Sequence, residues 1–398
     1  MPARPHLVAD MQASAPPVEL ALSRAGVTGV QKAIRIRRGD AETVMTADIE
    51  CTVDLARGQK GVHMSRFPEV FDEAIGDAVL GEARIVEEIA EVIARHIVER
   101  QQAVRAEVRI TARWPMRRMT PVTGLPTQEM VSLIGIAAAT ATGARRVVGV
   151  EATGINACPC AQGLVAARSA ERLAEAGFEP GDIERILELV PIATHNQRGR
   201  GTLLVGTAHD VDAETLVDLV ESSMSAPVFE LLKRPDELFV VEHAHLQPRF
   251  VEDSVRVALK GLLDAVPSLA DEDFVFSRQV NLETIHDHDV LAERWGTVGE
   301  LRGELVGADG ERQTTLADWL TRIFAIRSGP EIEMGLERIR PIFERMNVAP
   351  TCPGDSGCRN QWQRVSVRLP RCNPACSGLS CRAVHIAAHS SLQRAGGC

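Results

Sequence analysis

The sequence predicts an α+β protein in which antiparallel β-sheets are backed by paired helices. Neighbouring segments alternate apolar and polar residues, and a segment with helical periodicity follows them. The same order recurs in the second half of the chain. Two similar modules, each a sheet covered by its own helices, are the simplest arrangement that buries these apolar faces.

In the first half, residues 33–37 and 43–53 alternate like adjacent antiparallel strands with one solvent-facing side. From Phe67 to about Arg100 the apolar residues recur at helical spacing, which predicts one or two helices over that sheet. Strand patterning resumes at residues 104–112 and 147–150.

The second half predicts a strand at residues 202–205, helices at 213–223 and 251–263, and a strand at 273–280. Residues 164–189 have helical periodicity on either side of a Gly- and Pro-containing break at 177–181. An inserted helical hairpin is therefore expected in this segment.

Composition limits the class of protein. The chain has 398 residues, of which 45% are hydrophobic, enough for one large or two medium domains. A formal charge of -10 argues against a general nucleic-acid binder. The sequence contains neither an apolar run long enough for a membrane helix nor the apolar core of a signal peptide. We therefore expect a soluble cytoplasmic protein that binds neither nucleic acid nor membranes.

The two ends of the chain differ from its body. Residues 1–30 are expected to form a flexible arm. Six of the nine cysteines follow residue 350, and from Asn347 onward there are six Arg, no Lys and one acidic residue, Asp355. A disordered tail over residues 347–398 is the interpretation that this composition favours. A small metal-binding knuckle and an altered reading frame are the alternatives.

Cys158 and His195 are the most informative residues. Cys158 lies in the stretch Gly-Ile-Asn-Ala-Cys-Pro-Cys-Ala-Gln, and His195 follows the helical excursion. A thiolate and an imidazole suit a divalent metal that keeps a position open for catalysis. Cys160 is a less secure candidate. Metal-dependent hydrolysis is the first function to test.

Further clusters carry possible chemistry, and each has an ordinary alternative. Residues 233–237 place carboxylates beside cations, although a solvated helix end has the same composition. Glu252 opens a helix, where capping is the alternative role. His286 and His288 would share one face of a strand and are flanked by three acids. His63 and Arg66 precede a helix in a loop that could receive phosphate, although this signal alone is weak.

Together these segments resemble the type IB GTP cyclohydrolases and their archaeal-type relatives. The length of the excursion between Cys158 and His195, and the residues around His195, look closer to the archaeal-type branch. The matching stretches, which occur in family order, are residues 61–68, 154–162, 195–198, 231–237, 250–256 and 281–288.

The resemblance implies a tunnelling fold (T-fold) with two ββααββ-like modules per subunit. The modules would span residues 31–157 and 158–346, with the helical insertion at 162–190. It also implies GTP as the substrate, one divalent metal per site (Fe²⁺, Mn²⁺ or Zn²⁺), and a homotetramer with sites between subunits. A ring of subunits would also protect the open sheet edges.

Residue by residue, the resemblance implies a metal shell, a guanine anchor and a set of phosphate contacts. Glu252 would anchor guanine, and His288 would move protons, unless it and His286 exchange roles. Cys158 and His195 would be catalytic as well as metal-binding. The implied metal ligands are Cys158, His195, Glu237 and His286, and the implied phosphate contacts are among His63, Arg66, Arg198, Arg200 and Lys233.

The implied reaction explains these residue types. Opening the imidazole ring of guanine requires hydroxide, and a bound divalent metal lowers the pKa of water toward about 7. A carboxylate accepts two parallel hydrogen bonds from guanine, which adenine does not offer. Loss of formate and ring closure would give a 7,8-dihydroneopterin phosphate, either the triphosphate or the 2′,3′-cyclic phosphate, for folate or methanopterin synthesis.

Two other functions stay open on the sequence alone. In one, Cys158 is a nucleophile, as in the nitrile reductases that share the tunnelling fold. In the other, the protein binds metal or pterin without catalysis. Metal content distinguishes a reductase from a metal-dependent cyclohydrolase. Release of formate distinguishes a cyclohydrolase from a protein that only binds metal or pterin.

Overall fold

A computed structural model describes residues 12, 14–38, 41–80, 85–308, 310 and 313–321, all within one structural unit, Met1–Ile323. The predicted tail at 347–398 lies outside the described residues.

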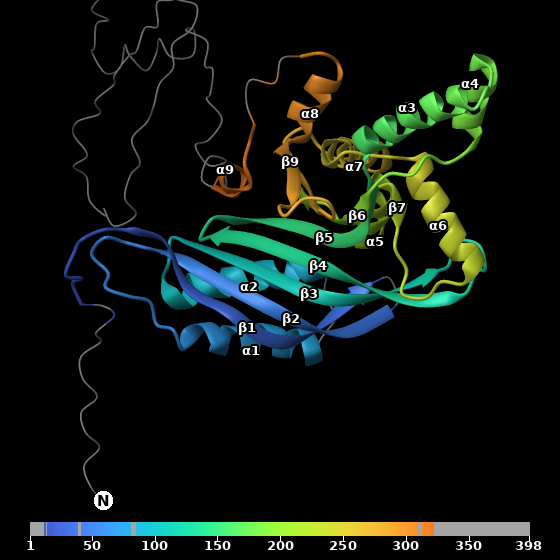
Figure 1. Ribbon diagram of the computed structural model, residues 1–398. Helices are drawn as coiled ribbons and strands as arrows, with labels where there is room; N and C mark the ends of the chain where they lie inside the picture. The colour runs from blue at the N-terminus through green and yellow to red at the C-terminus, as the bar shows by residue number, and fades with distance from the viewer. Residues whose placement is uncertain are drawn as a thin grey trace, which may run out of the picture. The chain divides into compact units, whose positions relative to one another are not determined.

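Figure 1 shows long strands packed against helices. The strands are β1 Leu22–Arg38, β2 Ala41–Leu55, β3 Arg105–Met119, β4 Pro126–Thr140, β5 Gly143–Ala157, β6 Asn196–Gly206, β7 Ala226–Pro227, β8 Phe274–Leu282 and β9 Val290–Thr297. The helices are α1 Arg66–Leu80, α2 Val86–Gln101, α3 Pro159–Glu175, α4 Pro180–Leu189, α5 Ala213–Ser223, α6 Arg234–Leu246, α7 Val251–Ala265, α8 Val298–Leu305 and α9 Leu316–Thr321.

The strands form one antiparallel sheet in the order β1-β2-β3-β4-β5-β6-β8-β9, with the short β7 paired to β5. The predicted α+β class, an antiparallel sheet backed by helices, is confirmed. Two strands, two helices and two strands precede β5, and a similar order follows from β5 onward. The two similar orders of elements meet at the β4–β5 hairpin, and the predicted module boundary after residue 157 lies at the end of β5.

Two segments of the structure differ from the prediction. Strand β1 begins at Leu22, within the expected flexible arm, because its residues pair with β2 from Leu22 opposite Leu55 onward. Strand β4 was not predicted at all. Its second half is rich in alanine and glycine, which have low strand propensity, and it is buried continuously because both of its faces are covered.

One apolar core runs along the helical face of the sheet. In the first half, Ile89, Ile93 and Ile97 of α2 pack in the same buried cluster as Val108 and Ile110 of β3. Helices α5 and α7 cover β5, β6 and β8 in the same way. At Gly135 a Cβ would lie 2.7 Å from the Val86 carbonyl oxygen, so glycine allows the start of α2 to approach β4.

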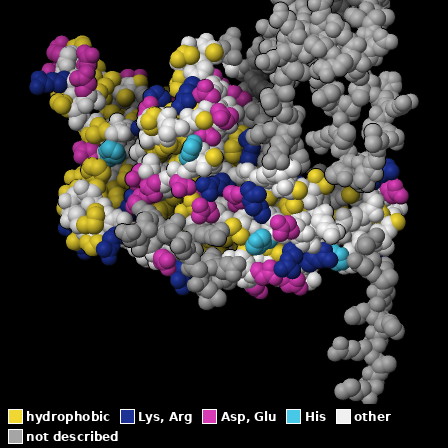
Figure 2. All heavy atoms as spheres, turned by 180° about the vertical axis from the view of Figure 1, so that it is seen from behind, with side chains coloured by type: hydrophobic (Ala, Val, Ile, Leu, Met, Phe, Trp, Pro, Cys, Tyr) yellow, Lys and Arg dark blue, Asp and Glu magenta, His cyan; other side chains and the backbone are white. Residues whose placement is uncertain are grey.

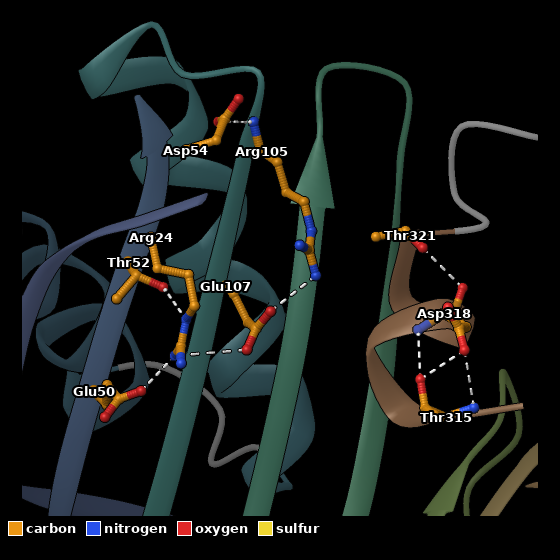
Figure 3. Close-up of polar contacts among 9 residues, drawn as sticks. All are labelled: Arg24, Glu50, Thr52, Asp54, Arg105, Glu107, Thr315, Asp318 and Thr321. Atoms are coloured by element: carbon orange, nitrogen blue, oxygen red, sulfur yellow. Dashed lines mark hydrogen bonds and ion pairs between the residues drawn. The ribbon is translucent and has the colours of Figure 1, made fainter. Parts of the chain in front are cut away.

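The opposite face of the sheet is partly charged. Arg24 of β1 donates to Glu50 and Thr52 of β2 and pairs with Glu107 of β3, which in turn pairs with Arg105 (Figure 3). Such cross-strand pairs between opposite charges stabilise a sheet by roughly 0.2–1 kcal/mol each. Figure 2, which views the molecule from behind Figure 1, shows acidic and basic side chains interspersed over the visible surface.

A smaller apolar cluster lies on this second face, where α9 covers it. Trp319 and Leu320 pack with Ile134, Ile136 and Phe274, and Trp319 Nε1 donates to the Glu272 carbonyl at 2.8 Å. Thr315 and Asp318 exchange hydrogen bonds at the start of α9 (Figure 3). The last described helix is therefore anchored on the sheet.

Helices α3 and α4 occupy the insertion expected at residues 162–190, and they project away from the sheet in Figure 1. Neither helix contains a buried residue. No helix among the described residues is long and apolar enough to span a membrane.

Glu87 provides a test of the α2 packing. It lies in the first turn of α2 with 3% exposure, and burial raises its pKa from 4.5 to about 7, while Arg146 acts in the opposite direction. A raised carboxyl pKa in the folded state destabilises the protein as pH rises through 4.5 to about 7. We expect Glu87→Gln to raise the free energy of unfolding by about 2–3 kcal/mol at pH 8 and to have little effect near pH 4, measured by urea unfolding. Glu99→Gln, at an exposed position of the same helix, is the control and should show no such pH dependence.

Candidate active site

Cys158 and His195 lie side by side where β5 ends and β6 begins. The N–H of Cys158 donates to the His195 carbonyl at 3.1 Å, and Thr194 Oγ1 donates to the Cys158 carbonyl at 2.8 Å. Cys158 is the N-cap of α3, and its Sγ accepts from the Ala161 N–H at 3.5 Å. These contacts hold the backbone of Cys158 and His195 together and place Cys158 Sγ at the N-terminus of α3.

Glu283, the first residue after β8, faces the same imidazole. His195 Nδ1 lies 3.7 Å from Glu283 Oε2, and their side chains are 14% and 7% exposed. Neither atom has a hydrogen-bond partner among the described residues. A buried polar atom without a partner costs free energy, so the pair suits a proton or a cation. The sequence analysis assigns Glu283 no role of its own, because it is only one of three acids that flank His286 and His288.

Helix α7 begins beside the same strand ends. The N–H of Arg249 donates to the Ala157 carbonyl at 3.0 Å, which holds the approach to α7 against the end of β5. Glu252 follows in the first turn and is exposed. The backbone N–H of Phe250 donates to Asp253 Oδ2 at 3.1 Å, so Asp253, and not Glu252, caps the helix. The carboxylate of Glu252 thus lies at the surface, in the first turn of a helix that begins beside the end of β5.

Residues 233–237 begin α6, and a buried neighbour holds them in place. Asp236 accepts hydrogen bonds from the backbone N–H groups of Val122, Thr123 and Lys233, and from Thr123 Oγ1 at 2.6 Å. Burial opposes ionisation of Asp236, but these hydrogen bonds prevail and hold its pKa well below the usual range. Lys233 and Glu237 are exposed on either side of it. The β3–β4 hairpin of the first half therefore positions a segment of the second half.

His286 and His288 do not lie on a strand. Strand β8 ends at Leu282, and both histidines are exposed in the bend before β9. Their rings nevertheless stack, with centroids 5.1 Å apart and planes 14° apart. The N–H of Glu283 donates to Asp289 Oδ1 at 3.2 Å, which closes the bend.

The cationic candidates fall into two groups. Arg198 and Arg200 are exposed on β6, close along the chain to His195. His63 and Arg66 lie near the end of α2: Gln101 Nε2 donates to the His63 carbonyl at 2.8 Å, and Arg66 Nη1 donates to the Arg100 carbonyl at 2.7 Å. Helix α2 leads into β3, whose first residues pair with the end of β4, opposite the end of the sheet that carries Cys158. Within one chain, His63 and Arg66 are therefore remote from Cys158.

Comparison with known proteins identifies the family. The model of the family described as type I GTP cyclohydrolase folE2 matches residues 8–292. The chain belongs to this GTP cyclohydrolase family. It is 41% identical to the GTP cyclohydrolase MptA of Methanococcus aeolicus over 74% of this chain and 99% of that protein. The proteins of the same name from Haloferax volcanii and Methanosarcina acetivorans are 41% and 38% identical, over 75% and 74% of this chain and 99% and 96% of their own lengths. A uricase from Arthrobacter globiformis matches with a TM-score of 0.41 and 10% identity over 74% of this chain and 96% of its own.

The four predicted metal ligands lie on several different segments of the described chain. Among the described residues, no three His, Cys, Asp or Glu side chains lie close enough together to hold a metal ion. Cys158 and His195 are together, but Glu237 is exposed on α6 and His286 is exposed in the bend after β8. Within the described residues, Cys158 and His195 are neighbours and Glu283 faces His195, while the shell of Cys158, His195, Glu237 and His286 stays a prediction. Cys160 is exposed in the first turn of α3.

Asp236 can be tested as the clamp on α6. Because its pKa is depressed in the folded state, its stabilisation is present above the ordinary value of 3.8 and is lost as pH falls below it. We expect Asp236→Asn to lower the urea midpoint at pH 7, since an amide nitrogen would face backbone donors. The difference in urea midpoint between Asp236→Asn and the parent protein should become smaller as pH falls from about 5 to about 3. Asp264→Asn, at an exposed position of α7 paired with Lys260, should leave the midpoint at pH 7 almost unchanged.

Proposed function

We propose that this protein is a metal-dependent GTP cyclohydrolase. It would hydrolyse the imidazole ring of guanine in GTP, release formate and form a 7,8-dihydroneopterin phosphate in pterin synthesis. The observation that carries the proposal is the position of Cys158, His195 and Glu283 at three neighbouring strand ends, where two buried atoms, His195 Nδ1 and Glu283 Oε2, have no hydrogen-bond partner among the described residues. Family membership and the names of the relatives support the same activity.

The donor set fits a divalent metal. A thiolate, an imidazole and a carboxylate are ligands that zinc, iron and manganese accept in different proportions. Cys158 and His195 would hold the ion, with Glu237 and His286 as further ligands after movement or from another subunit. When bound, the ion supplies Lewis acidity, which makes hydroxide available at neutral pH. A cation near His195 would also compensate the buried Glu283 oxygen.

The protein's own residues would bind the substrate and move protons. Glu252 would accept hydrogen bonds from the N1–H and 2-amino groups of guanine, since its carboxylate is exposed in the first turn of α7. Glu283 is placed to exchange a proton with His195 or with water. His288 would donate to or accept from the opened ring. Arg198, Arg200 and Lys233 offer exposed positive charge for the triphosphate.

The position of His63 and Arg66 supports a site between subunits. They are remote from Cys158 in their own chain, so phosphate contacts from them would have to reach the site of a neighbouring subunit. In the described chain, β1 and β9 are the outer strands of the sheet and each pairs on one side only. Pairing of such edges between subunits would protect them. A homotetramer follows as part of the proposal.

The test is an anaerobic incubation of metal-reconstituted protein with GTP, with formate measured and the pterin identified by mass. We expect formate and the 2′,3′-cyclic phosphate, the product implied by the archaeal-type resemblance. Formate together with the triphosphate would support the cyclohydrolase function but would place the reaction with the type IB enzymes instead of the archaeal-type ones. No formate with Fe²⁺, Mn²⁺ or Zn²⁺ would contradict the proposal and turn attention to a reductase with Cys158 as nucleophile, or to a binder.

Substitutions separate metal binding from guanine binding. We expect Cys158→Ala and His195→Ala each to lose bound metal and to reduce turnover by at least about 100-fold. Glu252→Gln should retain metal, because Glu252 is not a proposed ligand, and should weaken GTP binding by about tenfold or more. Metal content by elemental analysis and KM for GTP check the two effects. Full activity in Cys158→Ala would exclude the proposed metal site.

A further inference from the structure

A buried polar cluster lies directly behind the candidate site. It joins the ends of β5 and β8 to the first turn of α7 and to the segment before β7. All five residues are at most 2% exposed. Its members are Asn156, Ser225, Ser254, Gln279 and Asn281.

Asn156 is at the centre of this cluster, and a backbone donor settles its orientation. The N–H of Ser225 donates to Asn156 Oδ1 at 3.1 Å, which identifies this atom as the acceptor. The other end of the amide is therefore Nδ2. It donates to Asn281 Oδ1 at 3.0 Å and to Ser254 Oγ at 3.2 Å.

These contacts use both donors of the amide and give its oxygen a backbone donor. Nδ2 has two N–H groups and both are used, and Oδ1 accepts from the Ser225 N–H. The one Ser254 hydroxyl proton has two acceptors at 3.4 Å, Asn156 Oδ1 and the Phe250 carbonyl. Gln279 Nε2 supplies a further bond to Asn281 Oδ1 at 3.0 Å. Ser225 Oγ accepts from the Ala157 N–H at 3.1 Å, so the backbone beside Asn156 is held as well. An aspartate of the same shape could make neither of the Nδ2 donations.

Three of the segments that Asn156 connects carry a candidate site residue two positions away. Asn156 of β5 lies two residues before Cys158, Asn281 of β8 lies two residues before Glu283, and Ser254 follows Glu252 on α7. Elsewhere the same helices and strands are joined by apolar contacts, for example Leu259 and Leu262 of α7 in the main core. The hydrogen bonds of Asn156 thus lie beside the segments whose spacing sets the distances between Cys158, Glu283 and Glu252.

We propose that Asn156 is a positioning residue: it sets the spacing between the strand ends that carry Cys158 and Glu283 and the first turn of α7 that carries Glu252. Directional hydrogen bonds specify distance and orientation, which apolar packing does less strictly. Asn156 itself contacts neither substrate nor metal in this role. The inference rests on the proposed function, since it concerns the same site.

The test compares two variants with a matched control in the full-length protein. Asn156→Asp keeps the shape but removes both Nδ2 donations. Ser254→Ala removes one hydroxyl and loosens only the α7 connection, and it serves also where Asn156→Asp does not fold. Thr207→Val is the control, because Thr207 Oγ1 donates to buried Asp273 at 3.0 Å at the opposite end of the same strands.

Three quantities are measured for each variant: Tm, the Mn²⁺ dissociation constant of the metal-free protein, and KM and kcat for GTP at a temperature well below every Tm. We expect Asn156→Asp to raise both the Mn²⁺ dissociation constant and KM by about tenfold or more. Ser254→Ala should raise KM by about threefold to tenfold and leave Mn²⁺ affinity within about twofold. Thr207→Val should lower Tm and leave both constants unchanged.

The outcomes distinguish the two proposals. If Asn156→Asp and Ser254→Ala lower Tm as Thr207→Val does but leave Mn²⁺ affinity and KM unchanged, the positioning role is wrong and the cluster is only structural. If the parent protein forms no formate from GTP, the proposed function is wrong, whatever the variants do. An unchanged Mn²⁺ affinity in folded Asn156→Asp, with an active parent, would contradict the positioning role alone.

Discussion

The antiparallel register of β5, β6 and β8 is the constraint on which the candidate site depends. Ala157 pairs with Asn196 and Arg198 pairs with Leu282. The ends of β5 and β8 and the start of β6 therefore lie next to one another at one end of the sheet. Cys158, His195 and Glu283 are the next residue beyond each of these strand ends. A shift of one residue would turn every side chain of a strand to the other face and would separate the three groups.

The same constraint explains how a long insertion fits between two site residues. The N–H of Cys158 donates to the His195 carbonyl, so the chain leaves and re-enters the sheet at one point. Gln162 Nε2 donates to the carbonyls of Ile192 and His245, which ties the base of the insertion to the loop before His195 and to the end of α6. Helices α3 and α4 therefore extend outward without disturbing the strand ends.

The two halves of the chain are coupled by more than the sheet. The β3–β4 hairpin of the first half holds the start of α6 through Asp236, while Asn156 and its partners hold the start of α7. Helix positions around the site are thus set by buried, directional contacts between residues far apart in sequence. Such groups are costly when left without partners, which gives the arrangement its specificity.

The sequence by itself determined the fold class, the inserted hairpin, the family resemblance and the pairing of Cys158 with His195. These follow from local periodicity and from residue types in a fixed order, both of which are properties of neighbouring positions. Tertiary structure alone decided that Glu283 faces His195, that His286 and His288 lie beyond a strand, and that His63 and Arg66 are remote from Cys158. It also decided that β4 is a strand, although its alanine-rich half has low strand propensity. The reason is physical: strand partners, register and burial depend on contacts between distant segments, and no local pattern specifies them.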